Sequence, residues 1–223
     1  MIRKSLAFLT LALSASFASA TTIPASYNFA NSSEFKIGGG VAAQPYTAGV
    51  LVDFTLSYTG TLENNDFAAL WFNQSSNKEG YKGVNIGLKA NGGNGKSTSD
   101  LFVRGGGLGD GSYFKNSNLA AGQSAHLYAY LYKSDANGDY DRFSAWLNPT
   151  AAELTDLTKG QINLKVATGF SAFDTIAFRT ANIDKGVTVN INGLRVTEVP
   201  EPGSVALMGL ALAGLAAVRR KRA

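Results

Sequence analysis

The sequence predicts an all-β protein built as an antiparallel β-sandwich, and two observations carry this prediction. Short apolar or alternating runs recur about 10 to 15 residues apart along the chain, and clusters of Gly, Asn or Ser separate them. Such clusters are typical of the turns between strands. Within residues 21–198, only residues 149–159 (PTAAELTDLTK) show a helical pattern, one or two turns long, with Pro149 suited to a helix start.

The strands can be placed from the periodicity of their side chains. Residues 50–58 (VLVDFTLSY) alternate between apolar and polar positions, which indicates a strand with one buried face. The apolar members of that face are Val52, Phe54, Leu56 and Tyr58. Residues 67–72 (FAALWF) follow as a short apolar run. The other expected strands are residues 84–88, 101–103, 125–132, 143–147, 175–178 and 187–196, the last with Val187, Val189 and Ile191 on one side.

The first 20 residues, MIRKSLAFLTLALSASFASA, have the features of a secretory signal peptide. Two bases precede an apolar stretch at residues 6–13, and Ala18 and Ala20 fit a small-residue cleavage site. We expect export through the Sec machinery with cleavage after Ala20, which leaves a sandwich domain at residues 21–198. The chain has no cysteine, so the exported domain must fold without disulfides.

An uncharged apolar stretch of 16 residues, 203–218, lies near the C-terminus. As a helix with a rise of ~1.5 Å per residue it spans about 24 Å, slightly less than a hydrocarbon core of ~30 Å. A buried helix of the globular domain is the alternative, but the stretch has no polar face and ends in a charge block that could not be buried. We therefore expect a membrane segment with its terminal bases on the cytoplasmic side. These bases are Arg219, Arg220, Lys221 and Arg222.

A short motif, VPEPGS, joins the body to this apolar stretch. Its residues are Val199, Pro200, Glu201, Pro202, Gly203 and Ser204. Together with the apolar helix and the Arg-rich terminus, residues 199–223 resemble the PEP-CTERM sorting signal. The resemblance implies a Gram-negative host that makes exopolysaccharide. It also implies an exosortase, a membrane-embedded cysteine transpeptidase, which removes the tail after transient inner-membrane anchoring and delivers the body to the cell surface or extracellular matrix.

The formal net charge of +4 arises from the two targeting segments. Of the 20 basic residues, two precede residue 21 and four follow residue 198, whereas only one of the 16 acidic residues lies in these segments. Residues 21–198 therefore hold 14 basic and 15 acidic residues, a formal charge of −1. A body without a basic excess gives no support to nucleic-acid binding.

The chain from the stretch at residues 127–150 through the stretch at residues 173–198 resembles the second half of a concanavalin A-like, laminin-G-like jelly roll. The likeness lies in a long strand, a polar turn, a strand ending in Leu-Asn-Pro, and a late Phe-Asp-x-Ile-x-Phe strand. The resemblance implies two packed antiparallel sheets with ligand loops along one rim.

The polar turn in the first of these stretches, DANGDYD, is a candidate calcium site. Four side chains with oxygen atoms alternate in it: Asp135, Asn137, Asp139 and Asp141. A tight loop could point these oxygens at one centre, which suits Ca²⁺. The loop is not an EF-hand, because Tyr140 and Trp146 stand where that loop has Gly and Glu. A solvated hairpin turn is the alternative, and it is favoured because Asp, Asn and Gly are ordinary turn residues.

Three tyrosines share one face of the expected strand at residues 125–132, and Leu and Ala share the other. The tyrosines are Tyr128, Tyr130 and Tyr132. On an exposed sheet face they could bind sugar rings through their apolar surfaces. Tyrosine is also common inside sandwiches, so a structural role is favoured and either face could be the core. Trp71 and Trp146 stand in apolar strands, and we expect them to anchor the core.

The sequence shows no catalytic pattern. Glycoside hydrolysis needs two carboxyl groups that face each other across the scissile bond, and the alternating carboxylates of jelly-roll glucanases are absent. We expect the single histidine, His126, to be a packed or surface imidazole and the protein to be non-enzymatic. The sequence thus predicts an exported surface or exopolysaccharide-matrix protein that binds glycan. The alternatives are a structural matrix protein without a specific ligand and a glycoside-active enzyme.

Overall fold

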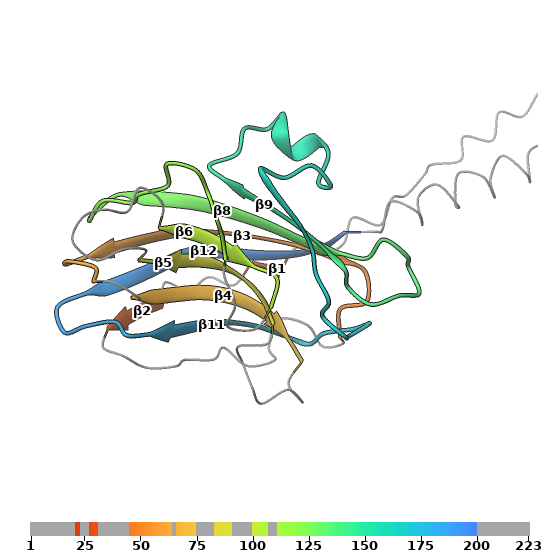
Figure 1. Ribbon diagram of the computed structural model, residues 1–223, viewed down its shortest axis with the longest axis horizontal. Coiled ribbons are helices and arrows are strands. Elements are labelled where there is room, and N and C mark those ends of the chain that lie inside the picture. The colour runs from red at the N-terminus through yellow and green to blue at the C-terminus, as the bar shows by residue number, and fades with distance from the viewer. Residues whose placement is uncertain are drawn as a thin grey trace, which may run out of the picture.

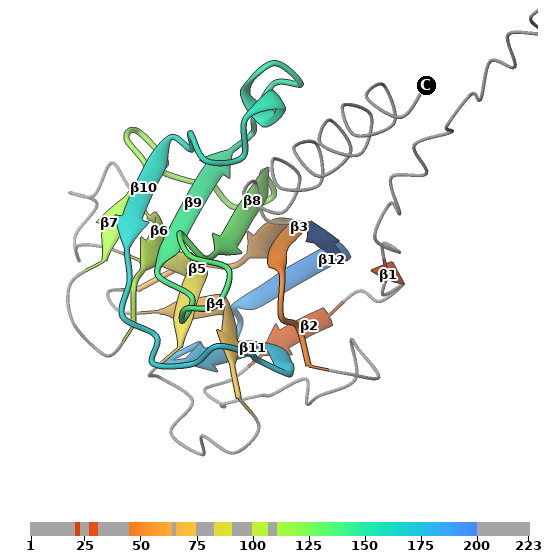
Figure 2. The same ribbon diagram turned by 90° about the vertical axis from the view of Figure 1, so that its right-hand side faces the viewer.

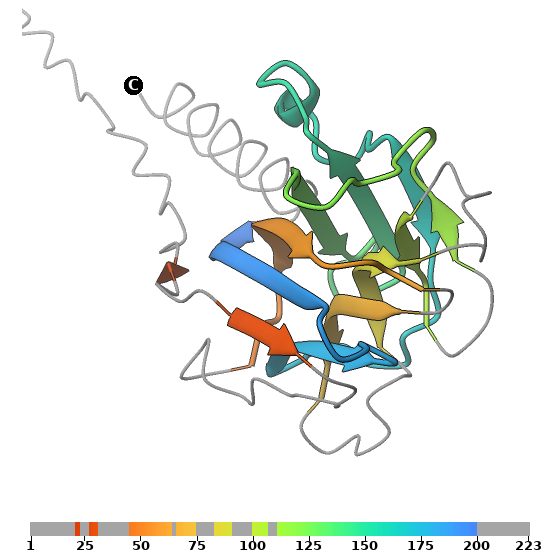
Figure 3. The same ribbon diagram turned by 90° about the vertical axis from the view of Figure 1, so that its left-hand side faces the viewer.

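The computed structural model describes residues 21–22, 27–30, 45–63, 66–74, 83–90, 100–106 and 111–199. In this part of the chain the strands form two antiparallel sheets that pack face to face (Figure 1). The predicted all-β antiparallel sandwich is confirmed. Figures 2 and 3 show the two layers from opposite sides.

The larger sheet has seven strands, and several strands that are hydrogen-bonded to each other come from distant parts of the sequence. Its order is β1 (Thr21–Thr22), β12 (Thr188–Val199), β3 (Gly49–Thr59), β8 (Ser124–Tyr132), β9 (Arg142–Leu147) and β10 (Ile162–Lys165), and β2 (Tyr27–Ala30) also pairs with β12. The smaller sheet has five strands, in the order β11 (Thr175–Ala181), β4 (Phe67–Asn73), β5 (Val84–Lys89), β6 (Leu101–Arg104) and β7 (Ser112–Tyr113).

The main core lies between the two sheets and follows the alternation of the strands. On β3, Val52, Phe54 and Leu56 are fully buried against it. The Phe54 ring meets Phe178 of the smaller sheet edge-on, with 5.4 Å between ring centroids, a geometry that adds to the burial of apolar area. The apolar face predicted for residues 50–58 is therefore the face of β3 that is turned toward the core.

All eight expected strands are present, and four further strands, β1, β2, β7 and β10, were not predicted. β10 lies at the edge of its sheet and has only four residues, INLK, of which two are half-buried and two exposed. Such a short edge strand gives little periodic signal. Residues 149–159 form a single 3₁₀ turn, η1 (Glu153–Thr155), instead of a longer helix. The turn ends because the Asp156 side chain accepts hydrogen bonds from the backbone and hydroxyl of Thr158.

The predicted targeting segments fall almost wholly outside the described residues. These are the signal peptide at 1–20, the motif from Pro200 to Ser204, the span at 203–218 and the bases at 219–222. No helix among the residues that the structure describes is long and apolar enough to cross a membrane. Val199, the first residue of the motif, closes β12 and pairs with Gly49 of β3.

Trp71 and Trp146 are buried as expected, but they lie outside the core cluster between the two sheets. The neighbours of Trp146 on β9, Phe143 and Ala145, are the ones in the main core. Because successive side chains of a strand point to opposite faces, Trp146 lies on the other side of its sheet. The same alternation on β4 places Trp71 on the far side of the five-stranded sheet.

Candidate ligand-binding face

The seven-stranded sheet has an outer face, defined here as the side turned away from the five-stranded sheet. On β8, Leu127, Ala129 and Leu131 belong to the main core. Alternation therefore puts the opposite set on the outer face: His126, Tyr128, Tyr130 and Tyr132. The sequence grouped the three tyrosines correctly but left open which side of the strand is core.

A row of four side chains crosses the outer face at right angles to the strands. Arg195 of β12 stands opposite Asp53 of β3, Asp53 opposite Tyr128 of β8, and Tyr128 opposite Trp146 of β9. We call Arg195, Asp53, Tyr128 and Trp146 the transverse row. With neighbouring strands ~4.8 Å apart, its three steps span about 14 Å, the size of a site for an extended ligand.

A β-bulge in β12 changes which of its side chains point to the outer face, and this change brings Arg195 into the transverse row. The pairing with β3 shifts between Asn192 and Arg195, and Gly193 has a positive φ of 65°. One extra residue in a strand reverses which side chains face which way. Ile191 and Leu194 both reach the core, and Arg195 therefore points outward. Gly193 suits this position because residues with a Cβ rarely adopt such a φ.

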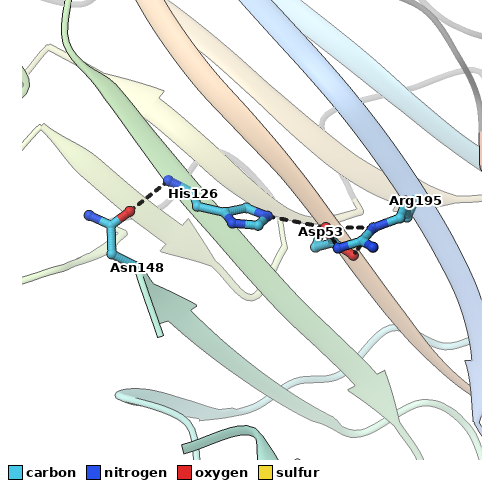
Figure 4. Close-up of polar contacts among 4 residues, drawn as sticks. All are labelled: Asp53, His126, Asn148 and Arg195. Atoms are coloured by element: carbon cyan, nitrogen blue, oxygen red, sulfur yellow. Dashed lines mark hydrogen bonds and ion pairs between the residues drawn. The ribbon is translucent and has the colours of Figure 1, made fainter. Parts of the chain in front are cut away.

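Asp53 is the hub of the polar contacts on the outer face (Figure 4). Its carboxylate accepts hydrogen bonds from Arg195 Nε, at 3.1 Å to both oxygens, and from Arg195 Nη2 at 2.8 Å. His126 Nε2 lies 3.1 Å from the same Oδ1. Asp53 is only 7% exposed, whereas the side chains of His126 and Arg195 are 38% and 51% exposed. The carboxylate is thus a buried support that orients two accessible nitrogen-bearing groups.

Tyr128 stands beside this cluster as a neutral phenol. Burial and the negative charge of Asp53 raise its pKa, while the charge and hydrogen bond of Arg195 act in the opposite direction. Its ring packs on the imidazole of His126, with 4.6 Å between centroids. The hydrogen bond and attraction of Asp53 raise the pKa of Arg195 above its ordinary value. At neutral pH the row therefore presents a phenol hydroxyl and a permanent cation.

Trp146 closes the row in an unusual environment. Its side chain is fully buried although it lies on the outer face, and its indole Nε1–H has no hydrogen-bond partner. A buried donor without an acceptor costs free energy relative to a solvated one. Trp146 stands beside Tyr128 on the neighbouring strand and does not offer its own ring to solvent.

The other two tyrosines lie one step along β8. The rings of Tyr130 and Tyr132 are nearly parallel, 13° apart, with 4.7 Å between centroids. Tyr130 is buried, and its hydroxyl occupies the space that a Cβ of Gly49 would need. Gly49 is therefore required for this packing. Of the three predicted ligand-binding residues, Tyr128 and Tyr132 are half-buried and accessible, and Tyr130 is structural.

Asn148 fixes the edge of the cluster where β9 ends. Its Oδ1 accepts a hydrogen bond of 2.8 Å from the backbone N–H of His126 (Figure 4). The backbone N–H of Asn148 donates to the His126 carbonyl at 2.7 Å. Asn148 has a φ of 46°, which asparagine tolerates better than most residues with a side chain. The two bonds hold the strand segment that carries His126.

The loop from Asp135 to Asp141 has the geometry of a turn. Asp135 Oδ1 accepts the N–H of Asn137 at 3.0 Å, and the Asp141 carboxylate accepts both the N–H and the hydroxyl of Ser134. Arg142 Nη1 lies 2.6 Å from Asp141 Oδ2. In the described part of the chain, no three His, Cys, Asp or Glu side chains are grouped to hold a metal. The proposed calcium ligands Asp135, Asn137, Asp139 and Asp141 therefore stay a prediction, and the contacts favour the turn.

Electrostatics at Asp141 agree with this description. Partial burial alone would raise its pKa, but the hydrogen bonds from Ser134 and the charge of Arg142 outweigh burial and lower the pKa. Ser134 and Arg142 already supply hydrogen bonds and a positive charge to this carboxylate, so a metal ion is not needed to offset its charge.

Comparison with known proteins identifies the end of the chain. Residues 198–221 match the PEP-CTERM protein-sorting motif. The chain carries a PEP-CTERM sorting signal. This confirms the resemblance found at residues 199–223, and the signal implies export and processing by an exosortase. No curated protein matches the chain.

Several solved structures are similar to this chain in fold at low identity. The exoplasmic domain of VIP36, in a form bound to Ca²⁺ and Man3GlcNAc, has 13% identity, covers 83% of this chain and 86% of its own, and has a TM-score of 0.47. A Lotus tetragonolobus seed lectin has 11% identity, coverages of 83% and 84%, and a TM-score of 0.42. An alginate lyase from Pseudomonas aeruginosa has 11% identity, coverages of 69% and 66%, and a TM-score of 0.40. At this level of similarity we draw no conclusion about function.

Proposed function

We propose that the mature protein is an exported surface or exopolysaccharide-matrix protein that binds glycan, without catalysis, on the outer face of its seven-stranded sheet. The observation that carries this proposal is the transverse row. It combines a fixed cation, a neutral phenol and an aromatic support across four adjacent strands.

The chemistry of the row suits a carbohydrate. A sugar ring has apolar C–H surfaces, which pack on aromatic rings, and hydroxyl edges, which need hydrogen-bond partners. Tyr128 and Tyr132 offer ring surface and hydroxyls, and Arg195 offers donors. Because Asp53 already holds Arg195 through three hydrogen bonds, little side-chain entropy is lost when a ligand binds.

The carboxylates argue for binding instead of hydrolysis. Asp53 is the one acidic side chain that β3, β8, β9, β10 and β12 place on the outer face. It is buried and bonded to Arg195 and His126. Glycoside hydrolysis with an acid and a base or nucleophile uses two carboxyl groups on either side of the bond. A single buried carboxylate does not provide this pair.

The sorting signal supports the location. It begins at the end of β12, whose last residue Val199 is paired in the sheet. In the proposed sequence of events, Sec exports the chain, the tail holds it briefly in the inner membrane, and exosortase releases or re-attaches the folded body. A structural matrix protein without a specific ligand would share this route.

A glycan array probed with the exported, processed protein tests the proposal. We expect binding to a defined subset of glycans, and we expect Tyr128→Ala to weaken it up to about tenfold, since an aromatic contact contributes about 0.5–1.5 kcal/mol. Lys185→Gln, an exposed change in the β11–β12 turn, is the matched control and should bind like wild type. If the wild-type protein binds no glycan, the structural alternative replaces this proposal.

A further inference from the structure

On the outer face the carboxylate is bonded within the protein, whereas the cations are more accessible to solvent. The one carboxylate of this face, Asp53, is buried and occupied by Arg195 and His126. Its cations are accessible: half of the Arg195 side chain is exposed, and Lys165 of β10 is exposed. Among the described residues, the Lys165 ammonium has no ion pair or hydrogen bond. The carboxylate of this face is buried and used internally, whereas Lys165 and half of the Arg195 side chain remain accessible to a ligand.

Two of the cations stand directly opposite each other. Lys165 pairs in register with Arg142 of β9, and alternation puts both on the outer face, because Phe143, Ile162 and Leu164 pack in the core. Like charges at opposed positions of a sheet are destabilising. Asp141 is bonded to Arg142 and offsets one of the two charges. An anion between Arg142 and Lys165 would offset the other.

The outer face has a net positive charge, whereas residues 21–198 as a whole do not. Its strands carry Arg195, Arg142 and Lys165 against Asp53, an excess of two positive charges, or of one if Asp141 is included. Residues 21–198 as a whole have a formal charge of −1. A positive face with aromatic rings between its cations attracts ligands that combine negative charge with sugar surface.

We propose that the glycan bound by this face is an acidic polysaccharide, whose rings carry carboxylate or sulfate groups, and that it lies across the strands from β12 to β10. This inference rests on the proposed glycan-binding function and specifies its ligand. Arg195 meets an anionic group at one end, and Lys165 with Arg142 meets another at the far end. Arg195 and Lys165 are four strand steps apart across the sheet and four residues apart along it, a separation of about 23 Å at ~4.8 Å per strand and ~3.3 Å per residue, so an oligosaccharide is engaged instead of one ring. Tyr128 and Tyr132 contact the rings between.

The experiment uses the exported, processed protein and pairs of polysaccharides that share a backbone but differ in charge. The pairs are polygalacturonate with its methyl ester, carboxymethyl dextran with dextran, and dextran sulfate with dextran. Affinities are measured by calorimetry at low and high salt. We expect the charged member of at least one pair to bind about tenfold more tightly, and we expect added salt to weaken that binding. The carboxylate and sulfate arms distinguish the two sources of charge.

Variants locate the charge dependence. Lys165→Gln should weaken binding of the charged member about two- to fivefold, as expected for one exposed ion pair, and should leave the melting temperature unchanged or slightly higher. The same change at Lys185 should have no effect. If charged and neutral members bind equally, or if Lys165→Gln and Lys185→Gln behave alike, the acidic ligand is excluded while glycan binding stands. If no member of any pair binds and the glycan array is also negative, the proposed function itself fails.

Discussion

The two sheets of the sandwich turn very different surfaces away from the core. The outer face of the seven-stranded sheet carries charged and phenolic side chains that solvent reaches. The back face of the five-stranded sheet, its side turned away from the core, is mostly buried. It combines a second apolar cluster, formed by Phe67, Ala69 and Phe102, with buried polar side chains such as Asn85 and Thr175. Arg104 and Arg179 lie over Phe102 and Phe67, at 5.3 and 5.8 Å from the ring centroids.

The two faces hold their arginines in different ways. On the back face, Arg104 is buried over Phe102, where it contributes to packing. On the outer face, Arg195 is held by a buried carboxylate while half of it remains exposed. The arrangement that orients a group and leaves it accessible is the one that favours a ligand.

The largest expected effects concern stability, on both faces. Phe102→Ala and Trp146→Ala each remove a fully buried aromatic side chain, and each should lower the free energy of unfolding by about 3–5 kcal/mol. Urea denaturation monitored by circular dichroism measures this. Tyr132→Ala, which removes a half-buried ring, is the contrast and should cost clearly less. A near-neutral Trp146→Ala would mean that this ring is not buried as described.

A smaller effect on stability is expected at Asp53, the buried carboxylate that orients Arg195 and His126. Asp53→Asn keeps the shape but removes the charge that holds Arg195, so we expect a loss of about 1.5–3 kcal/mol of stability, the range for hydrogen bonds to charged groups. Glycan affinity should fall with it. Thermal melts and calorimetry measure the two effects. Unchanged glycan affinity would show that orientation of Arg195 does not matter.

The bulge in β12 offers a local way to disturb the same row. Gly193 has a φ of 65° and open space around its Cβ position, so Gly193→Ala meets backbone strain and no collision. We expect a cost of about 1–2 kcal/mol, measured by denaturant unfolding. Gly169→Ala, at a φ of 69° outside the row, should cost a similar amount but leave glycan affinity unchanged, whereas Gly193→Ala should lower it. Equal binding by the two variants would argue against a role for the bulge.

The smallest effect is expected in the loop from Asp135 to Asp141. The pKa of Asp141 is lowered in the folded state, so its contribution to stability is present above its unfolded pKa, about 3.9, and is lost as the pH falls through the lower folded value. Asp141→Asn should therefore be less stable than wild type at neutral pH, and the difference should shrink in acid. Stability measured against pH checks this. A difference that grows in acid would contradict it.

Calcium tests the same loop independently. Because the carboxylates of Asp135 and Asp141 already have donors, we expect Ca²⁺ above the ~10⁻⁴–10⁻³ M range of extracellular modules to leave the melting temperature unchanged. A rise equivalent to about 2.7 kcal/mol at a hundredfold excess over the dissociation constant would instead establish a site. Loss of that rise in Asp139→Ala would assign it to this loop.

The features that could be predicted from the sequence are those that depend on residues close together along the chain. Alternation revealed β3 and the shared tyrosine face of β8, and the contiguous motif at Val199–Ser204 revealed the sorting signal. The polar hub could not be found in this way, since Asp53 and Arg195 are 142 positions apart. Their meeting depends on strand register and on a one-residue bulge. The orientation of Trp146 was missed because an apolar strand does not show which of its faces meets the other sheet.

The most direct test of the central claim compares one arginine from each face. Arg195→Gln and Arg179→Gln remove the same charge, from the outer face and the back face, in the exported and processed protein. With the tightest-binding glycan from the array, calorimetry should show about a tenfold loss for Arg195→Gln, the effect of one hydrogen-bonded charged contact, and a change below about twofold for Arg179→Gln, within the reach of an indirect effect. Equal losses, or a larger loss for Arg179→Gln, would contradict the assignment of the ligand to the seven-stranded sheet.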